Sequence, residues 1–365
     1  MRILSFRGSP RAIGRAFGES CREEMRELYA LRLANTIGHA RKHAGRELDE
    51  RAVLEVARAC LEPTRAYHPA GFEELEGLAE GAGMSLARVL ALNGLTDLRD
   101  VVTWSSAPDQ EGCTSFIARG DATRDGGTIY AQTWDLLTDN GPYVLAVHRR
   151  PDDGPATWCF TTVGCLSLIG LNEEGIAVGT TNLKTLDGRP GVIYLSVLHR
   201  ALACRSYEDA TRSVTEAARA GAHYYFVGYR DERACGIECS ATEATRIELR
   251  EGTRVQTNHC LVPANRARQA ALSASSSSSS KARLERARQL LASASGRLDV
   301  AAARRILSDR ENGEDAILRE DYNDTTTNGA VVMLPGRGEL WACGGLPDRA
   351  EWVELVSASQ RATCA

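Results

Sequence analysis

The order of helical and strand patterns constrains the fold of this chain more than any other feature. Residues 10–95 carry apolar side chains at helical spacing, as in AVLEVARACLEPTRAY. After residue 113 the pattern changes to short, alternating, β-branched runs separated by Gly, Asp and Pro clusters. Strands joined by such short turns pair antiparallel, because parallel pairs need long crossovers. We therefore expect antiparallel sheets covered by helices, an α+β layered fold.

The rest of the chain can be divided in the same way. A hairpin is expected about the turn Asn172–Gly175, followed by helices at 192–204 and 207–220 and a strand meander over 224–259. Two amphipathic helices are expected at 282–293 and 299–309, and a closing hairpin at 329–345. The low-complexity run SASSSSSSK, residues 273–281, predicts a mobile surface loop.

Composition narrows the classes of partner. The net charge is −4, which gives no electrostatic reason to expect nucleic acid or an anionic membrane as partner. No apolar run reaches the ~20 residues that span a bilayer, and the N-terminus lacks the apolar core of a signal peptide. We therefore expect a cytoplasmic protein without membrane or nucleic-acid partners.

The 11 cysteines are scattered through the chain, which favours reduced thiols over a disulfide framework. Only Cys235 and Cys239 have a spacing that would suit a metal, and no second Cys or His pair follows at ligand spacing. No bound metal is expected.

The step Gly112–Cys113–Thr114–Ser115 can be interpreted in two ways. It is either a tight turn that leads into a strand with a buried Cys, or a peptide bond built to break. In the second case the Cys113 thiol attacks the Gly112 carbonyl and forms a thioester, which water then cleaves. The freed α-amine has a pKa of about 7.7–8, close to the ~8.5 of a thiol, and can act as a built-in general base.

A third interpretation is a conventional thiol hydrolase in which Cys113 pairs with His259. The sequence around Cys113 lacks the local signature of papain-like enzymes. A nucleophile with its own α-amine needs no histidine, so we expect His259 to be structural.

Several segments, taken in order, resemble the isopenicillin N acyltransferase family, whose members are autoproteolytic N-terminal-nucleophile hydrolases. The resemblance is carried by five segments: RGSPRAIGRAFGE (7–19), ELEGLAEGAGMSLARVLALN (74–93), the Gly112–Cys113 step, AQTWD (131–135) and TNHCL (257–261).

This resemblance implies a four-layer αββα sandwich of two antiparallel sheets flanked by helices, with a helical N-terminal part. It further implies cleavage into segments 1–112 and 113–365, which together form one domain and stay associated as a heterodimer. The implied reaction takes an acyl group from a small N-acyl amide through a Cys113 thioester to water, which we favour, or to an amine. No cofactor is implied, and acyl-coenzyme A would enter only as a co-substrate.

The resemblance also assigns roles to residues. Cys113 would be the nucleophile and, with Gly112, the cleavage site, and the Ser115 hydroxyl would assist the cut. Asp135 would orient the nucleophile's amine. Asn258 would stabilise the oxyanion of the tetrahedral intermediate.

Four further residues are candidates for support of the site or for substrate binding: Ser240, Asn182, Thr327 and Asn328. The last two stand where the penicillin enzyme has a Ser-Arg pair, so the hydroxyl is kept and the guanidinium is lost. This departure weakens the case for a penicillin substrate and for coenzyme A use. An uncleaved, catalytically silent binding protein of the same fold remains the other alternative.

Overall fold

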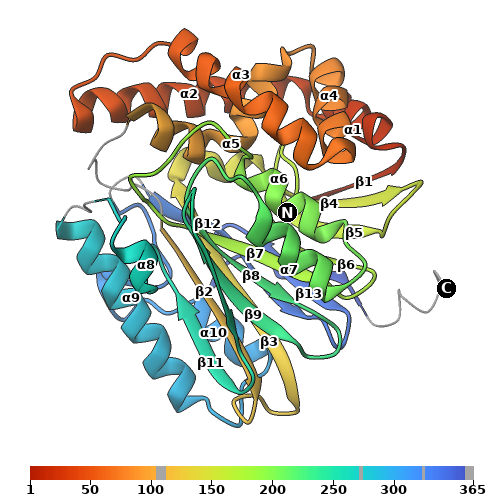
Figure 1. Cartoon of the computed structure of the whole chain (residues 1–365). Coiled ribbons are helices and arrows are strands. Elements are labelled where there is room, and N and C mark those ends of the chain that lie inside the picture. The colour runs from red at the N-terminus through yellow and green to blue at the C-terminus, as the bar shows by residue number, and fades with distance from the viewer. Residues whose placement is uncertain (104–111, 271–273, 323–324, 358–365) are drawn as a thin grey trace.

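The computed structural model describes residues 1–103, 112–270, 274–322 and 325–357. Two β-sheets stack face to face, and helices cover the outer face of each (Figure 1). This is the four-layer αββα arrangement expected above, which is thereby confirmed.

The first sheet has eight strands, and it pairs antiparallel throughout except at one edge, where β1 runs parallel to β4. Through β1 the N-terminal segment adds a strand to the sheet of the C-terminal part. In spatial order the strands are β1 (Arg2–Gly8), β4 (Val144–Pro151), β5 (Thr157–Thr162), β6 (Ile169–Asn172), β7 (Ala177–Asn182), β8 (His223–Gly228), β9 (Ala234–Cys239) and β10 (Ala244–Glu248).

The second sheet has six strands, and all of its pairs are antiparallel. In β12 the register against β3 shifts between Thr327 and Gly329, so Asn328 is the extra residue of a bulge. In spatial order the strands are β11 (Gly252–Gln256), β2 (Gly112–Gly120), β3 (Gly126–Leu137), β12 (Thr325–Leu334), β13 (Glu339–Gly344) and β14 (Val353–Val356).

Helices from the N-terminal segment cover the eight-stranded sheet together with α6 and α7, while α9 and α10 cover the six-stranded sheet (Figure 1). The predicted helical block and helix pair are thus confirmed. The helices are α1 (Pro10–Ser20), α2 (Arg22–Ala44), α3 (Glu50–Tyr67), α4 (Pro69–Ala82), α5 (Leu86–Thr103), α6 (Tyr194–Leu202), α7 (Tyr207–Glu216), α8 (Pro263–Arg266), α9 (Ala274–Ser293) and α10 (Val300–Leu307), with the short 3₁₀ helices η1 (Thr138–Tyr143) and η2 (Gly313–Asp315). No helix within the described ranges is both long and apolar enough to cross a bilayer.

The prediction of a mobile loop over residues 273–281 is wrong for the part that the structure describes. Residues 274–281 form the first turns of α9. Ser279 and Ser280 are buried where this helix packs on the six-stranded sheet. Serine has only a modest intrinsic cost in a helix, so tertiary packing of one face can override a low-complexity composition.

The two N-terminal motifs that carried part of the resemblance meet at one helix–helix contact. Gly14 of α1 and Gly77 of α4 let the backbones touch: a Cβ on Gly14 would lie 2.0 Å from the Glu74 carbonyl oxygen, and one on Gly77 would lie 2.1 Å from that of Arg11. Gly18 and Gly81 repeat this approach one turn along, at 2.5 and 2.2 Å from backbone oxygens. These glycines therefore serve helix packing rather than chemistry.

One buried side chain joins the two sheets beside the site described next. The Gln132 side chain of β3 accepts a hydrogen bond from the Thr180 N–H of β7 at 3.2 Å and donates to the Thr180 carbonyl. The glutamine of the AQTWD segment is thus used to hold one sheet to the other.

Candidate active site

Cys113 is the second residue of β2 and lies between the two sheets, where only 5% of it is exposed. Its neighbour in the register is Trp134 of β3, and Gly112 lies opposite Asp135. The segment that the sequence singled out is therefore an inner strand of a sheet rather than a surface turn.

The backbone of Cys113 is held by side chains on both sides. Its N–H donates to Oδ1 of Asn258 at 2.9 Å, and its carbonyl accepts from Nη1 of Arg283 at 2.7 Å. Nη2 of Arg283 donates to the same Asn258 oxygen at 2.9 Å. Two donors converge on Oδ1, so the orientation of the Asn258 amide is fixed. Its Nδ2 donates to the carbonyl of Asn182 at 3.1 Å.

Arg283 is a functional candidate that the sequence did not reveal. It lies on α9, is 1% exposed, and also donates to the Thr114 hydroxyl at 3.1 Å. Burial, together with the charge of Arg319, lowers the pKa of Arg283 to about 10. In sequence it is one of several arginines in an amphipathic helix, and only the packing of α9 distinguishes it from a surface residue.

Asp135 lies at the end of β3 beside the Gly112–Cys113 bond. A Cβ built on Gly112 would be 3.4 Å from Oδ2 of Asp135 and 2.6 Å from Nη1 of Arg319, so glycine leaves room for both groups. The Thr327 hydroxyl donates to Oδ1 at 2.8 Å, while Oδ2 is buried without a donor among the residues the structure describes. Burial raises the pKa of Asp135 to about 6, although Arg283 and Arg319 oppose the shift.

The other predicted residues have different surroundings. The Ser115 hydroxyl is buried and donates to the Gln256 carbonyl at 3.4 Å. Asn328, at the bulge, donates to the carbonyls of Leu136 and Thr326 at 3.1 Å each. Its side chain thus ties the end of β3 to β12.

Ser240 and His259 make their contacts away from Cys113. The Ser240 hydroxyl donates to Oδ2 of Asp187 at 2.7 Å, in a turn after β9. Nδ1 of His259 lies 2.7 Å from the Ser280 hydroxyl, and burial lowers the pKa of His259 to about 4. Neither side chain is among those that line the pocket at Cys113.

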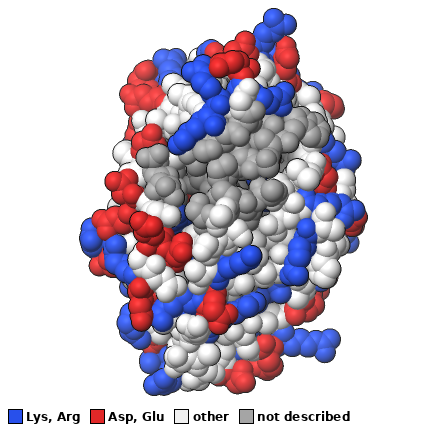
Figure 2. Space-filling model, turned by 90° about the vertical axis from the view of Figure 1, so that its left-hand side faces the viewer, with Lys and Arg blue, Asp and Glu red and all other residues white. Residues whose placement is uncertain are grey.

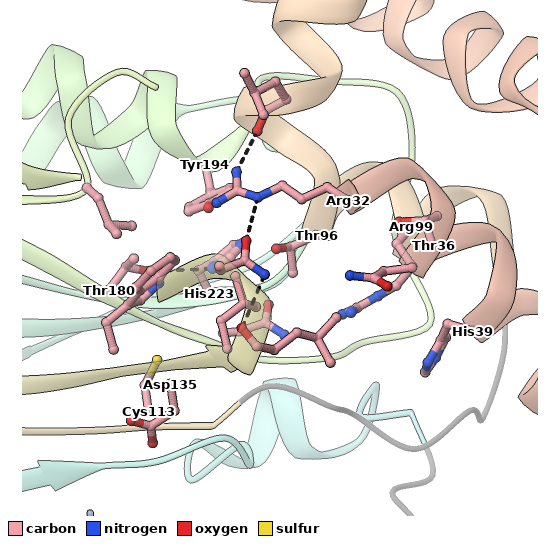
Figure 3. Close-up of a pocket in the computed structure, with 18 residues that line it drawn as sticks. Arg32, Thr36, His39, Thr96, Arg99, Cys113, Asp135, Thr180, Tyr194 and His223 are labelled. Atoms are coloured by element: carbon pink, nitrogen blue, oxygen red, sulfur yellow. Dashed lines mark hydrogen bonds between the residues drawn. The ribbon is translucent and has the colours of Figure 1, made fainter. Parts of the chain in front are cut away.

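A pocket of about 800 Å³, its open mouth included, extends from Cys113 to the helices of the N-terminal segment. Figure 3 shows Cys113 and Asp135 on one side of this pocket and Arg99, Thr36 and His39 on another. His223, whose Nε2 lies 2.9 Å from Asp97, stacks on Tyr194 in its wall. The lining residues are Arg32, Asn35, Thr36, His39, Leu92, Thr96, Arg99, Cys113, Trp134, Asp135, Leu136, Leu137, Asn140, Leu168, Thr180, Asn182, Tyr194 and His223.

Charged side chains of both signs are interspersed over the face drawn in Figure 2. This is the pattern of an ordinary solvated surface rather than of a basic nucleic-acid footprint. The described residues hold no group of three or more His, Cys, Asp or Glu side chains that could bind a metal ion.

Comparisons with known proteins agree with the motifs. The sequence model of the family "Acyl-coenzyme A:6-aminopenicillanic acid acyl-transferase" matches residues 122–338. The chain is 24% identical over 263 residues to the 40 kDa form of acyl-coenzyme A:6-aminopenicillanic-acid-acyltransferase from Emericella nidulans, a match that covers 71% of this chain and 69% of that protein.

Solved structures with detectable likeness include a variant of conjugated bile acid hydrolase from Clostridium perfringens (TM-score 0.48, 11% identity, 67% of this chain and 92% of that chain). Penicillin V acylase from Agrobacterium tumefaciens is another (TM-score 0.44, 12% identity, 67% and 86%). The family assignment rests on the sequence match, which spans more than half of the chain. The protein belongs to the acyl-coenzyme A:6-aminopenicillanic acid acyltransferase family, as the order of its motifs had indicated.

Proposed function

We propose that this protein is an acyl-transferring amide hydrolase that activates itself by cutting the Gly112–Cys113 bond. Cys113 then acts as an N-terminal nucleophile, takes an acyl group from an N-acyl amide, and passes it to water in preference to an amine. The observation that carries the proposal is the clamp on Cys113: buried Asn258 holds its N–H and buried Arg283 holds its carbonyl, at 2.9 and 2.7 Å.

The first step is the cut itself. Sγ of Cys113 attacks the Gly112 carbonyl carbon, and the thiol proton passes to the Asp135 carboxylate beside that bond. The C–N bond then breaks, the proton moves to the leaving nitrogen of Cys113, and Gly112 is held as a thioester. Water hydrolyses the thioester, which leaves a carboxylate on Gly112 and a free amine and thiol on Cys113. A carboxyl group with a pKa of about 6 is suited to move a proton at neutral pH.

Turnover repeats this chemistry on a substrate. The freed amine, still donating to Oδ1 of Asn258, has a lone pair that accepts the thiol proton as sulfur attacks the amide carbonyl. The oxyanion that forms is stabilised by an N–H of the Asn258 amide, which has two such donors and gives one to Asn182. The amine product leaves with the proton, and water releases the acyl group from sulfur. No cofactor takes part, and acyl-coenzyme A would serve only as an alternative acyl donor.

Segments 1–112 and 113–365 would stay together after the cut. Strand β1 pairs along its length with β4, and the glycine contact between α1 and α4 keeps the N-terminal helices packed as one layer over the sheet. The heterodimer would therefore be held by the β1–β4 hydrogen bonds and by the apolar core to which both segments contribute side chains.

Mass spectrometry under denaturing conditions tests the proposal directly. The freshly purified wild-type chain should give two masses, for residues 1–112 and 113–365, whereas Cys113→Ala should give one. Cys204→Ala is the matched control, because Cys204 is a half-buried thiol after α6 outside the pocket, and it should be cut like the wild type. A wild-type chain that stays in one piece while it turns over an amide would disprove self-processing.

A further inference from the structure

One face of α2 carries polar side chains that line the pocket and have no part in the chemistry proposed above. Arg32, Asn35, Thr36 and His39 follow the spacing i, i+3, i+4 and i+7, which places them on one side of a helix. We call these four residues the α2 stripe. Figure 3 shows Arg32, Thr36 and His39 of the stripe beside the cavity that Cys113 lines.

Arg32 is a buried cation whose hydrogen-bond partners, among the residues that the structure describes, are all uncharged. Its guanidinium donates to Oδ1 of Asn140 and the Leu92 carbonyl at 3.0 Å each, to the Thr162 hydroxyl at 3.2 Å and to Sγ of Cys165 at 3.6 Å. Only 8% of the residue is exposed. A guanidinium has five N–H groups, so these four bonds leave one of them for another acceptor. A buried charge held only by neutral groups is costly and gains from an anion that binds beside it.

Asn35 adds a second donor to the stripe. Its Nδ2 is buried and has no acceptor among the residues that the structure describes. Arg99, which reaches the same pocket from α5, differs because Asp100 lies 3.6 Å from its Nε and compensates its charge. Among the described residues, the cation without an anionic partner (Arg32) and the amide N–H without an acceptor (Asn35) thus lie on the same face of α2.

We infer that the α2 stripe binds a carboxylate of the substrate, so that the preferred substrates are N-acyl amides with a carboxylate, such as N-acyl amino acids. This inference rests on the proposed function and names the substrate class for it. A carboxylate offers two acceptor oxygens and a negative charge, which match the guanidinium and the amide N–H. The lost guanidinium at Asn328 does not prevent this, because the cation of the stripe comes from another element.

The test uses matched pairs of substrates that differ only in charge: N-acetyl-, N-phenylacetyl- and N-octanoylglycine, each with its glycinamide. For the wild type, kcat/KM should favour the acid by about 10- to 100-fold in at least one pair, the range of a charge-assisted hydrogen bond. Arg32→Gln should remove this preference and leave kcat/KM for the amide within about three-fold, since the amide gains nothing from the charge.

Asn35→Asp keeps the shape of the side chain and places a negative charge in the stripe, so it should also lower kcat/KM for the acid alone. If Arg32→Gln fails to fold, the acid-to-amide ratio of Asn35→Asp still tests the inference. Arg41→Gln, which removes an exposed arginine of the same helix paired with Glu47, should change neither substrate. An equal loss for acid and amide in the stripe variants, or a wild type without preference, would overturn the inference.

Binding separates this inference from the proposed function. Calorimetric titration of the acids and amides into Cys113→Ala measures recognition without turnover. If the acid binds more tightly there while the wild type is neither cut nor active, the proposed function fails and the carboxylate site stands. If the wild type cuts itself and turns over amides, yet binding shows no charge preference, only the carboxylate site fails.

Discussion

At the scale of single residues, three buried charged side chains, Asp135, Arg283 and Arg319, lie around the Gly112–Cys113 bond. Burial disfavours the charged form of both Asp135 and Arg283, so it raises the pKa of the carboxyl and lowers the pKa of the guanidinium. Arg319 stands on the other side of Gly112. Of these groups the Asp135 carboxyl, with a pKa of about 6, is the one suited to transfer a proton at the Gly112 carbonyl near neutral pH.

Asp135→Asn should slow self-cleavage about 100-fold or more at pH 7, because an amide cannot accept the thiol proton. In the wild type, the rate of cleavage should fall as the pH drops below about 6, where Asp135 becomes protonated. Time courses of precursor loss on gels, from pH 5 to pH 8, measure both effects. Cleavage by Asp135→Asn at the wild-type rate would assign the carboxylate to structure.

The raised pKa of Asp135 also makes the stability of the fold depend on pH. The folded-state pKa of Asp135 lies above the usual value, so its contribution to stability is present at acidic pH and is lost as the pH rises through about 6. In the uncut Cys113→Ala background, Asp135→Asn should therefore gain stability relative to its parent at pH 7 but not at pH 4. Urea unfolding at the two pH values checks this, and a loss at pH 7 would show that the ionised carboxylate stabilises the fold.

The sequence predicted Cys113, Asp135 and Asn258 through the order of the segments that carry them, since each segment alone is a weak signal. In the structure all three lie beside the Gly112–Cys113 bond. The sequence did not predict Arg283 or Arg32. Each lies in a long helix with several arginines, and the sequence alone does not show which arginine of such a helix is buried and which is solvated. What separates them is contact with residues far along the chain, such as Cys113 and Asn140.

At the scale of elements, helical and strand periodicity predicted most of the layers correctly, while the Ser-rich run misled. The first turns of α9 carry side chains that bind the site: the Ser280 hydroxyl accepts from the Asn258 N–H at 2.9 Å. The Ser-rich segment, whose composition is typical of linkers, thus forms the start of the helix that carries Arg283. Composition reports how a segment behaves alone, and α9 is held by what it packs against.

The contact between α1 and α4 gives a prediction at this scale. Gly77→Ala should destabilise the protein by about 1–3 kcal/mol, because its Cβ would overlap the Arg11 carbonyl and the helices would have to separate. Gly38→Ala is the matched control: it lies inside α2 with nothing within 4 Å of the new Cβ, and it should be neutral or stabilising by about 0.5–1 kcal/mol. Denaturant midpoints of the two variants compare them, and an equal effect would disprove close glycine packing.

At the scale of the whole molecule, the proposed cut after Gly112 would convert one chain into two that share a sheet. The uncut Cys113→Ala protein should refold from denaturant with a yield that does not depend on its concentration, because β1 and β4 belong to one chain. The cut wild type should recover less at low concentration, since its segments must first meet. Recovered activity for the wild type, and recovered fluorescence for both proteins, measured over a dilution series test this. A yield for the wild type that does not vary with dilution would mean that the segments never separate.

The pocket between the two segments also bears on how such enzymes diversify. The α2 stripe belongs to residues 1–112, while Cys113 begins the segment that carries the reacting groups. If both proposals hold, the groups that recognise the substrate carboxylate and the groups that react lie on different segments of the chain, joined by the β1–β4 pairing and by the pocket that both line. Mutations on α2 could then change the preferred metabolite and leave Cys113, Asp135 and Asn258 untouched, and exchanging the N-terminal segments of two relatives should exchange their preferences while the chemistry stays the same.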